Sequence, residues 1–244
     1  MPITFLEIDL ASFESIQACA KRFLSLTSRL DILICNAGIM ALPPGLTKDG
    51  YELQFGTNFL GHALLTKLLL PTLLTTAKEP NSDVRVVFLS SIAFSVHPTG
   101  GIVFKDLKTK QDNFLLSGSF QRYGQSKLAA ILYAAELSRR YKDSGIIFLS
   151  IHPGTFNTGL IRTLGVAKRA MIWISNAGNV RNEKKHGEGA WNSCWAATAK
   201  RGTLENGGYY VPVGVKGKKF RENANEKLAG ELYEWTGKEL ETWN

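Results

Sequence analysis

The stretch that decides the fold is Asp31-Ile32-Leu33-Ile34-Cys35-Asn36-Ala37-Gly38, an apolar run of strand length that stops at a turn-forming Asn-Ala-Gly. Before it, residues 13–28 repeat apolar side chains at helical spacing behind Ser12, a residue type that caps helix N-termini. Residues 3–10 predict a further strand that ends in an acid and a leucine. This strand–helix–strand alternation with short connections indicates a parallel sheet covered by helices on both faces.

The same alternation continues downstream. The expected strands are 84–89, 146–151 and 207–213, and the expected helices are 46–77 (interrupted near Pro71), a helix after residue 119 that ends near 142, 188–199 and 222–235. Residues 99–119 are polar and irregular and predict a surface excursion. No repeat or linker divides the chain, so we expect one α/β domain over residues 1–244.

Composition excludes several classes of protein. The chain has 244 residues, 44% of them hydrophobic, and a net charge of +8 that is scattered rather than gathered. Its short basic groups, 184–185 and 216–219, lack interleaved aromatic residues and predict solvated surface, so no nucleic-acid partner is expected. Three widely spaced cysteines without a Cys/His ligand pattern predict free thiols in a reducing compartment and no metal.

The location follows from two further segments. The N-terminal residues run directly into a strand-like segment, so no signal peptide is expected. The longest apolar run, 63–74, contains Lys67 and Pro71 and is too short for a bilayer, so no transmembrane segment is expected. We therefore expect a cytoplasmic protein.

The chemistry concentrates in Tyr123-Gly124-Gln125-Ser126-Lys127. A Tyr and a Lys four residues apart lie on one face of a helix, so their polar ends can meet. A phenol has a pKa of about 10, and a nearby ammonium favours the phenolate. Ser91 follows the 84–89 strand at its carboxyl end, where open α/β sheets bind ligands. Asn58 lies in an apolar helix, and Pro153-Gly154 ends the 146–151 strand.

Together these pieces resemble the short-chain dehydrogenase/reductase family of Rossmann-type enzymes. The resemblance rests on Asp9-Leu10, Asn36-Ala37-Gly38, Asn58, Ser91 with Tyr123 and Lys127, and Pro153-Gly154 with Thr158, in the family's order and over nearly the whole chain. The stretch 53–62 is similar to retinol-dehydrogenase-like enzymes and to fungal secondary-metabolism reductases. The family resemblance implies a doubly wound, Rossmann-like parallel sheet. It also implies hydride transfer between a carbonyl or alcohol and NADP(H), with NAD(H) as the alternative.

The resemblance also implies the role of each catalytic residue. Tyr123 would exchange a proton with the substrate oxygen, and Ser91 would hold that oxygen. Lys127 would lower the pKa of Tyr123 and bind the nicotinamide ribose. Asn58 would orient a water that links Lys127 to solvent. Hydride transfer leaves an alkoxide-like oxygen, which needs such a donor and acid.

Further residues would bind the cofactor. By the resemblance, Asp9 would meet the adenine amino group, Asn36 and Gly38 would line the adenine-ribose side, and Phe156 and Thr158 would contact the carboxamide. Asp9 has an alternative role as a helix-start charge, and Asn36 as a strand-end turn residue. Residues 162–176 are either a substrate lid or ordinary packing, and their apolar character suggests a lipophilic substrate. A homodimer through the helices of Asn58 and Tyr123 is the family's habit and an expectation here.

One departure from the family is large. The sequence has no TGxxxGxG turn, and its first glycine is Gly38. The family's first two strands, which lie between its third and fourth, are therefore expected to be missing, leaving the dinucleotide-binding half incomplete. Residues 3–9 would lack a partner, and the 32–35 strand would be an apolar edge prone to aggregation.

Two interpretations follow. The chain is either a shortened form of an active enzyme, or a natural truncation without robust cofactor binding that serves as a remnant or interaction module. A serine hydrolase is excluded, because no GxSxG is present.

Overall fold

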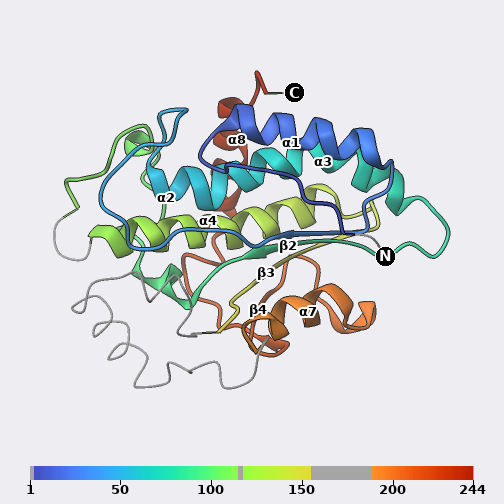
Figure 1. The fold of residues 1–244 in the computed structure, drawn as a ribbon. Coiled ribbons are helices and arrows are strands. Elements are labelled where there is room, and N and C mark those ends of the chain that lie inside the picture. Colours follow the sequence, from blue (N-terminus) through green and yellow to red (C-terminus); the bar gives the residue numbers. More distant parts are fainter. Residues whose placement is uncertain (1–2, 115–117, 155–187, 244) are drawn as a thin grey trace.

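The computed structural model describes residues 3–114, 118–154 and 188–243. Its described part forms three layers, with a sheet between a large group of helices and the single helix α7 (Figure 1). The sheet has the order β1-β2-β3-β4-β5, and neighbouring strands are parallel except for the antiparallel β4–β5 pair. The predicted Rossmann-like α/β architecture, wound on both faces of a mainly parallel sheet, is confirmed.

The strands are short and their bounds follow the apolar runs. They are β1 (Ile32–Cys35), β2 (Val84–Leu89), β3 (Ile146–Ile151), β4 (Tyr209–Val211) and β5 (Val215–Lys216). The predicted spans of β2 and β3 are confirmed to the residue. The predicted strand at 207–213 is shorter than expected, and sequence reasoning missed β5, which pairs back on β4 across a tight turn at Gly214.

The helices lie before, between and after the strands in the chain. They are α1 (Phe13–Leu26), α2 (Leu53–Phe55), a π-helix (Gly56–Leu60), α3 (Gly61–Ala77), α4 (Gly118–Arg140), α7 (Trp191–Thr198) and α8 (Glu226–Glu239). The 3-10 helices are Ile92–Val96, Phe104–Asp106, Glu188–Ala190 and Arg201–Thr203. The last predicted helix, 222–235, is displaced by about one turn because Asn225 supplies the N-terminal cap, its side chain accepting from the Leu228 amide.

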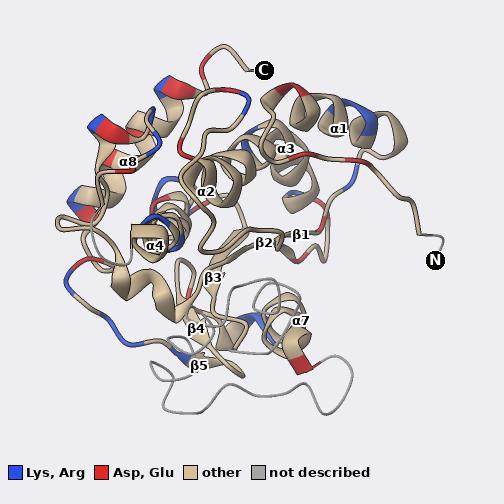
Figure 2. Ribbon diagram, turned by 60° about the vertical axis from the view of Figure 1, so that its left-hand side comes forward, with Lys and Arg blue, Asp and Glu red and all other residues tan. Residues whose placement is uncertain are grey.

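Alternate residues of β2 serve the two faces of the sheet. Val84, Val86 and Phe88 belong to the main core beneath α3 and α4, whereas Val87 and Leu89 belong to a smaller core beneath α7. This period-two pattern lets a strand be buried on both faces. Figure 2 shows the complementary distribution of charge: Lys, Arg, Asp and Glu gather on the outer helices such as α1 and α8, and the strands carry few.

Arg85 is the charged residue of β2, and it is 2% exposed. Its guanidinium donates to the Ala196 and Ala199 carbonyls at 2.9 and 2.6 Å and pairs with Asp83. These carbonyls are among the last of α7, where a helix leaves acceptors without partners. Arg85 therefore fastens α7 to the sheet by its C-terminal end.

The predicted strand at residues 3–10 is wrong. The segment is extended but belongs to no sheet, and Ile3 and Phe5 are 98% and 86% exposed. A strand needs a neighbour for its backbone groups, and β1 pairs only with β2 among the described residues. Leu10 nevertheless packs onto α3, where the missing side chain of Gly61 admits the Leu10 carbonyl.

The predicted helix at 46–77 begins late and is not interrupted. Leu46 forms an isolated bridge with Glu52, and the helical run starts at Leu53. Pro71 lies inside α3 without ending it. The run 53–77 has the length and hydropathy of a membrane span, but 56% of its most apolar window is buried, as in a core helix.

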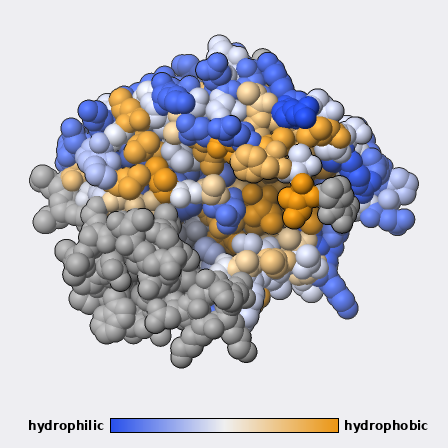
Figure 3. Space-filling view, viewed as in Figure 1, coloured by the Kyte–Doolittle hydropathy of each residue, from blue (hydrophilic) through white to orange (hydrophobic). Residues whose placement is uncertain are grey.

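β1 forms an open edge of the described sheet. Ile32 and Ile34 are 39% and 38% exposed, so helices do not cover this end of the described sheet completely. Figure 3 shows hydrophobic side chains gathered on the same face, beneath α1. The expected apolar edge is therefore present.

Gly61→Ala is expected to destabilise the protein by roughly 1–3 kcal/mol. A Cβ there would lie 2.5 Å from the Leu10 carbonyl oxygen and force the N-terminal segment away from α3. Urea unfolding followed by circular dichroism measures the change. In the control, Gly230→Ala, the added Cβ meets nothing within 4 Å in the described part, so this helical position should become more stable by about 0.5–1 kcal/mol. Equal effects at both positions would contradict the close contact.

Ile34→Lys is expected to reduce aggregation on warming, because a charge on an open edge opposes strand pairing between molecules. Light scattering at several protein concentrations measures the effect. Val213→Lys is the control, since Val213 is 47% exposed beside β4, at the opposite edge of the sheet. Aggregation that falls equally in both variants would show that net charge, not the β1 edge, controls it.

Candidate active site

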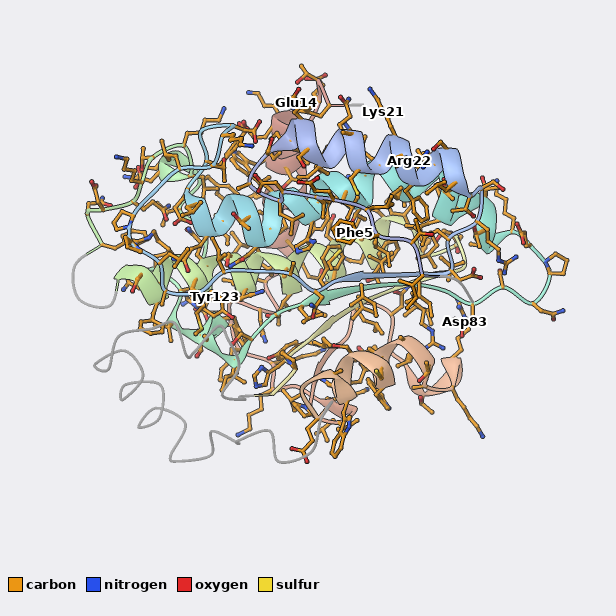
Figure 4. All side chains as sticks on the ribbon, viewed as in Figure 1. Phe5, Glu14, Lys21, Arg22, Asp83 and Tyr123 are labelled. Carbon is orange, nitrogen blue, oxygen red and sulfur yellow. The ribbon has the colours of Figure 1, made fainter. Side chains whose placement is uncertain are left out.

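The polar side chains gather at the carboxyl ends of the parallel strands. β1 ends before Asn36, β2 before Ser90-Ser91, and β3 before His152. Figure 4 labels Tyr123, on α4, at the opposite end of the sheet from Asp83, which precedes β2. This is the edge at which open α/β sheets bind ligands.

Tyr123 and Ser91 meet there. The Tyr123 side chain is nearly buried, and the Ser91 hydroxyl lies close enough to its phenol to lower the pKa of that group. Ser91 is held by its own turn, since its Oγ accepts from the Ala93 amide at 3.2 Å and begins the 3-10 helix Ile92–Val96. Gly124 allows α4 to approach, because a Cβ there would lie 2.6 Å from the Ala93 carbonyl oxygen. The two predicted catalytic hydroxyls are thus brought together by α4 and the turn after β2.

Lys127 lies one turn beyond Tyr123, as the spacing predicts. Its Nζ donates to the Leu89 carbonyl at 2.9 Å and lies 5.6 Å from the centroid of the Tyr123 ring. The backbone of the same residue is also tied to this strand end, because the Ser90 hydroxyl donates to the Lys127 carbonyl at 2.7 Å. Two bonds therefore fix Lys127 against the end of β2.

Asn58 occupies the π-helix between α2 and α3. Its Oδ1 accepts from the Ile39 amide at 2.8 Å, and its Nδ2 donates to the Ile39 carbonyl and the Ser126 hydroxyl at 2.9 and 3.0 Å. A Cβ on Gly38 would lie 2.8 Å from Asn58 Oδ1 and 3.5 Å from Lys127 Nζ, so this glycine brings the loop close to both. The contacts place Asn58 beside Lys127, while its predicted role in orienting water stays a prediction.

Burial controls the protonation of this group. It raises the pKa of Tyr123 to about 12, and the neighbouring Ser91 hydroxyl opposes the rise. It also lowers the pKa of Lys127 to about 8 and that of neighbouring His62 to about 4, because the interior disfavours their charged forms. Burial and Ser91 shift the Tyr123 pKa in this arrangement, and the expected effect of Lys127 on that pKa stays a prediction. The Lys127 ammonium faces the Tyr123 ring and the Leu89 carbonyl.

The predicted cofactor residues fall into three groups. Asn36 and Gly38 lie exposed at the end of β1, and Gly38 borders Lys127. Asp9 lies before α1, where its carboxylate accepts from the Ala11 amide and pairs with Lys48, in keeping with the helix-start alternative. Phe156 and Thr158, like the 162–176 segment, lie outside the described residues.

The donor set fits one end of a nicotinamide dinucleotide. Lys127 and Tyr123 offer a cation and a hydroxyl beside Gly38. Because Gly38 has no side chain, its backbone lies next to the Lys127 ammonium. For the pyrophosphate end the sequence contains no TGxxxGxG turn, and no described residue is assigned to it.

Sequence reasoning missed Ser90 and Ser126, whose hydroxyls anchor Lys127 and Asn58. The Ser126 hydroxyl also donates to the Tyr123 carbonyl at 2.7 Å. Ser126 lies within the quoted Tyr-to-Lys stretch, but a serine in a helix usually bonds its own backbone, so the sequence carried no signal for the cross-link.

Known proteins are similar to this chain in sequence. The sequence model of the short chain dehydrogenase family matches residues 1–105. An uncharacterized oxidoreductase of Schizosaccharomyces pombe is 40% identical over 98% of this chain and 70% of its own length. The short-chain dehydrogenase/reductase drtF of Aspergillus calidoustus is 34% identical over 98% of this chain and 77% of its own.

Solved structures agree on the fold. An uncharacterized Mycobacterium paratuberculosis protein superposes with a TM-score of 0.69 at 30% identity, over 97% of this chain and 75% of the other. NADPH-bound carbonyl reductase from chicken fatty liver gives 0.60 at 22% identity, over 88% and 77%, and shares the fold. With a strand-end Ser–Tyr–Lys group and relatives matching almost its full length, the chain belongs to the short-chain dehydrogenase/reductase family and is an oxidoreductase by kinship.

Proposed function

We propose that this protein interconverts a carbonyl compound and an alcohol by hydride transfer with NADP(H), with NAD(H) as the alternative. The observation that carries the proposal is the juxtaposition of the Tyr123 phenol and the Ser91 hydroxyl, which lowers the pKa of that phenol, at the end of β2, with Lys127 one turn away. Two neighbouring hydroxyls can bind the same substrate oxygen from two sides, which is what a developing alkoxide requires.

The residues divide the work. When bound, the nicotinamide would supply or accept the hydride. Tyr123 gives its phenolic proton to the substrate oxygen during reduction and takes it back during oxidation. Ser91 donates a hydrogen bond to the same oxygen and holds it next to Tyr123. Lys127 binds the nicotinamide ribose, and Asn58 keeps the 38–39 loop and α4 together beside it.

The cofactor preference rests on family resemblance and a weak electrostatic argument. A net charge of +8 favours an anionic dinucleotide, and NADP carries one phosphate more than NAD. Two proteins that share the fold, the carbonyl reductase and a gluconate 5-dehydrogenase from Burkholderia cenocepacia, bind NADPH and NADP. Asp9, Asn36, Gly38, Phe156 and Thr158 remain the proposed contacts of the dinucleotide.

The remaining proposals concern substrate and setting. We propose a lipophilic small-molecule substrate because residues 162–176 are apolar in sequence, and a cytoplasmic location because free cysteines suit a reducing compartment. A role in secondary metabolism follows from the resemblance to fungal reductases, and a homodimer through the helices of Asn58 and Tyr123 from the family's habit. The alternative is a protein without robust cofactor binding that acts as a remnant or interaction module. A fluorescence titration with NADPH separates the two, because only the enzyme should bind the dinucleotide at micromolar concentrations.

Tyr123→Phe is expected to lower kcat about 10²- to 10⁴-fold, because the substrate oxygen loses its proton donor. The loss of NADPH absorbance with benzaldehyde as the probe substrate measures turnover. Tyr133→Phe is the control: it removes a phenol from the same helix, where the ring packs against Phe59 and Phe88. Turnover close to wild type in Tyr123→Phe would refute the assignment.

Lys127→Met is expected to abolish turnover and yet stabilise the fold at pH 7 by about 1–3 kcal/mol. The folded pKa of Lys127 is about 8, below its ordinary 10.5, so below pH 8 the fold carries a buried charge that it disfavours. Between pH 8 and about 10 the folded state has lost this proton while the unfolded state keeps it, so wild-type stability should rise with pH.

Urea unfolding at several pH values measures both effects. The rise above pH 8 should be absent in Lys127→Met. A variant that is less stable than wild type at pH 7 would show that the bond to the Leu89 carbonyl outweighs the cost of burying the charge.

A further inference from the structure

Glu52 and Arg122 form an ion pair inside the protein, next to the site but outside the roles assigned above. Arg122 Nε and Glu52 Oε1 are 3.3 Å apart, and their side chains are 3% and 0% exposed. Arg122 directly precedes Tyr123 in the chain. Glu52 lies six residues before Asn58, at the start of the same helical run.

Each partner is fixed by further bonds. The Glu52 carboxylate accepts from the Phe55 amide at 2.6 Å and so caps the N-terminus of α2. The Arg122 guanidinium donates to the Gln111 carbonyl at 2.9 Å and to the Leu42 carbonyl at 3.3 Å. Its charge also interacts with Asp112. The pair therefore connects the beginning of the Asn58 helix, the beginning of the Tyr123 helix and two loops.

The pair belongs to a row of cross-links. Ser119, Arg122 and Ser126 recur at three- and four-residue spacing and share one face of α4. Gln54 Nε2 donates to the Ser119 carbonyl at 2.9 Å, and Asn58 Nδ2 to the Ser126 hydroxyl at 3.0 Å. With the ion pair between them, these bonds oppose sliding and rotation of α4 along the 52–58 segment.

Stability alone explains the pair poorly. Moving two charges out of water costs free energy that their attraction often does not recover, so an apolar pair would usually serve as well. Burial raises the pKa of Glu52 to about 7, and Arg122 opposes that rise. The facing atoms, Glu52 Oε1 and Arg122 Nε, also have no hydrogen-bond partner of good geometry in the described part of the chain. What the pair adds is a long-range constraint between two helices.

We propose that Glu52 and Arg122 are positioning residues. They keep α4 in register with the 52–58 segment, and this register sets Tyr123 and Asn58 in the positions that catalysis requires. The proposal rests on the proposed function, because register matters only if Tyr123 transfers a proton. A displacement of about 1 Å at a reacting group can cost about 10²-fold in rate. The pair touches neither the substrate oxygen nor the nicotinamide site in this arrangement and acts through the helix that carries Tyr123.

The test compares Glu52→Gln, the neutral double variant Glu52→Gln/Arg122→Gln, and a control on the full chain. The control is Glu234→Gln, which makes the same change in the partner of another α4 arginine, Arg140, at the exposed end of the helix. Steady-state kinetics with NADPH and benzaldehyde give kcat and KM. The nuclear magnetic resonance signal of Tyr123, in protein with carbon-13-labelled tyrosine and assigned with Tyr123→Phe, reports its surroundings without turnover.

We expect Glu52→Gln to lower kcat about 10- to 100-fold with KM nearly unchanged, and to shift the Tyr123 signal. The double variant should recover part of the loss, because it leaves no unpaired buried charge, and it decides the matter if Glu52→Gln fails to fold. The control should match wild type. Variants that lower only Tm, with kcat per folded molecule and the Tyr123 signal at wild-type values, would overturn the proposal. A wild-type chain without turnover would instead defeat the proposed function, and the Tyr123 signal would still test the register.

Discussion

The structure depends on how closely α4 approaches the carboxyl end of β2. Gly124 permits the approach, and the bonds from Lys127 to the Leu89 carbonyl and from the Ser90 hydroxyl to the Lys127 carbonyl fix it. Because these bonds join a helix to the end of a buried strand, the hydroxyls of Tyr123 and Ser91 meet without a flexible loop to carry them. The same water-poor contact disfavours charge. Burial therefore raises the pKa of Tyr123 and lowers the pKa of Lys127, and both shifts favour the neutral side chain.

The sequence predicted the parts of the fold that depend on local pattern. The β2 and β3 runs are continuous, apolar and bounded by polar residues, and their ends were predicted to the residue. The predictions failed where contacts with neighbouring elements decide the local structure. Residues 3–10 have the composition of a strand and no strand beside them, and the helical run including α3 accommodates Pro71, which a local rule treats as a break.

The candidate site shows the same division. Helical spacing was sufficient to place Tyr123 and Lys127 on one face, and the position of Ser91 followed from the end of a strand. The partners that hold them were beyond reach, because Ser126, Glu52 and Arg122 are joined by contacts between residues far apart in the chain. The burial that raises the pKa of Tyr123 was also beyond reach, since a sequence does not state how much water a side chain loses.

The attachment of α7 has a consequence for how the molecule comes apart. Among the described residues, the core beneath α7 is much smaller than the core beneath α3 and α4. Arg85 holds the C-terminal end of α7 through the Ala196 and Ala199 carbonyls, and Asn192 ties its N-terminal end to the His152 and Tyr210 carbonyls. Because the α7 layer and the α3/α4 layer are held to the sheet by cores of such unequal size, they should not unfold as one cooperative unit. Backbone amides of α7 should accordingly exchange with deuterium through a lower-energy opening that leaves the Tyr123 side of the sheet closed.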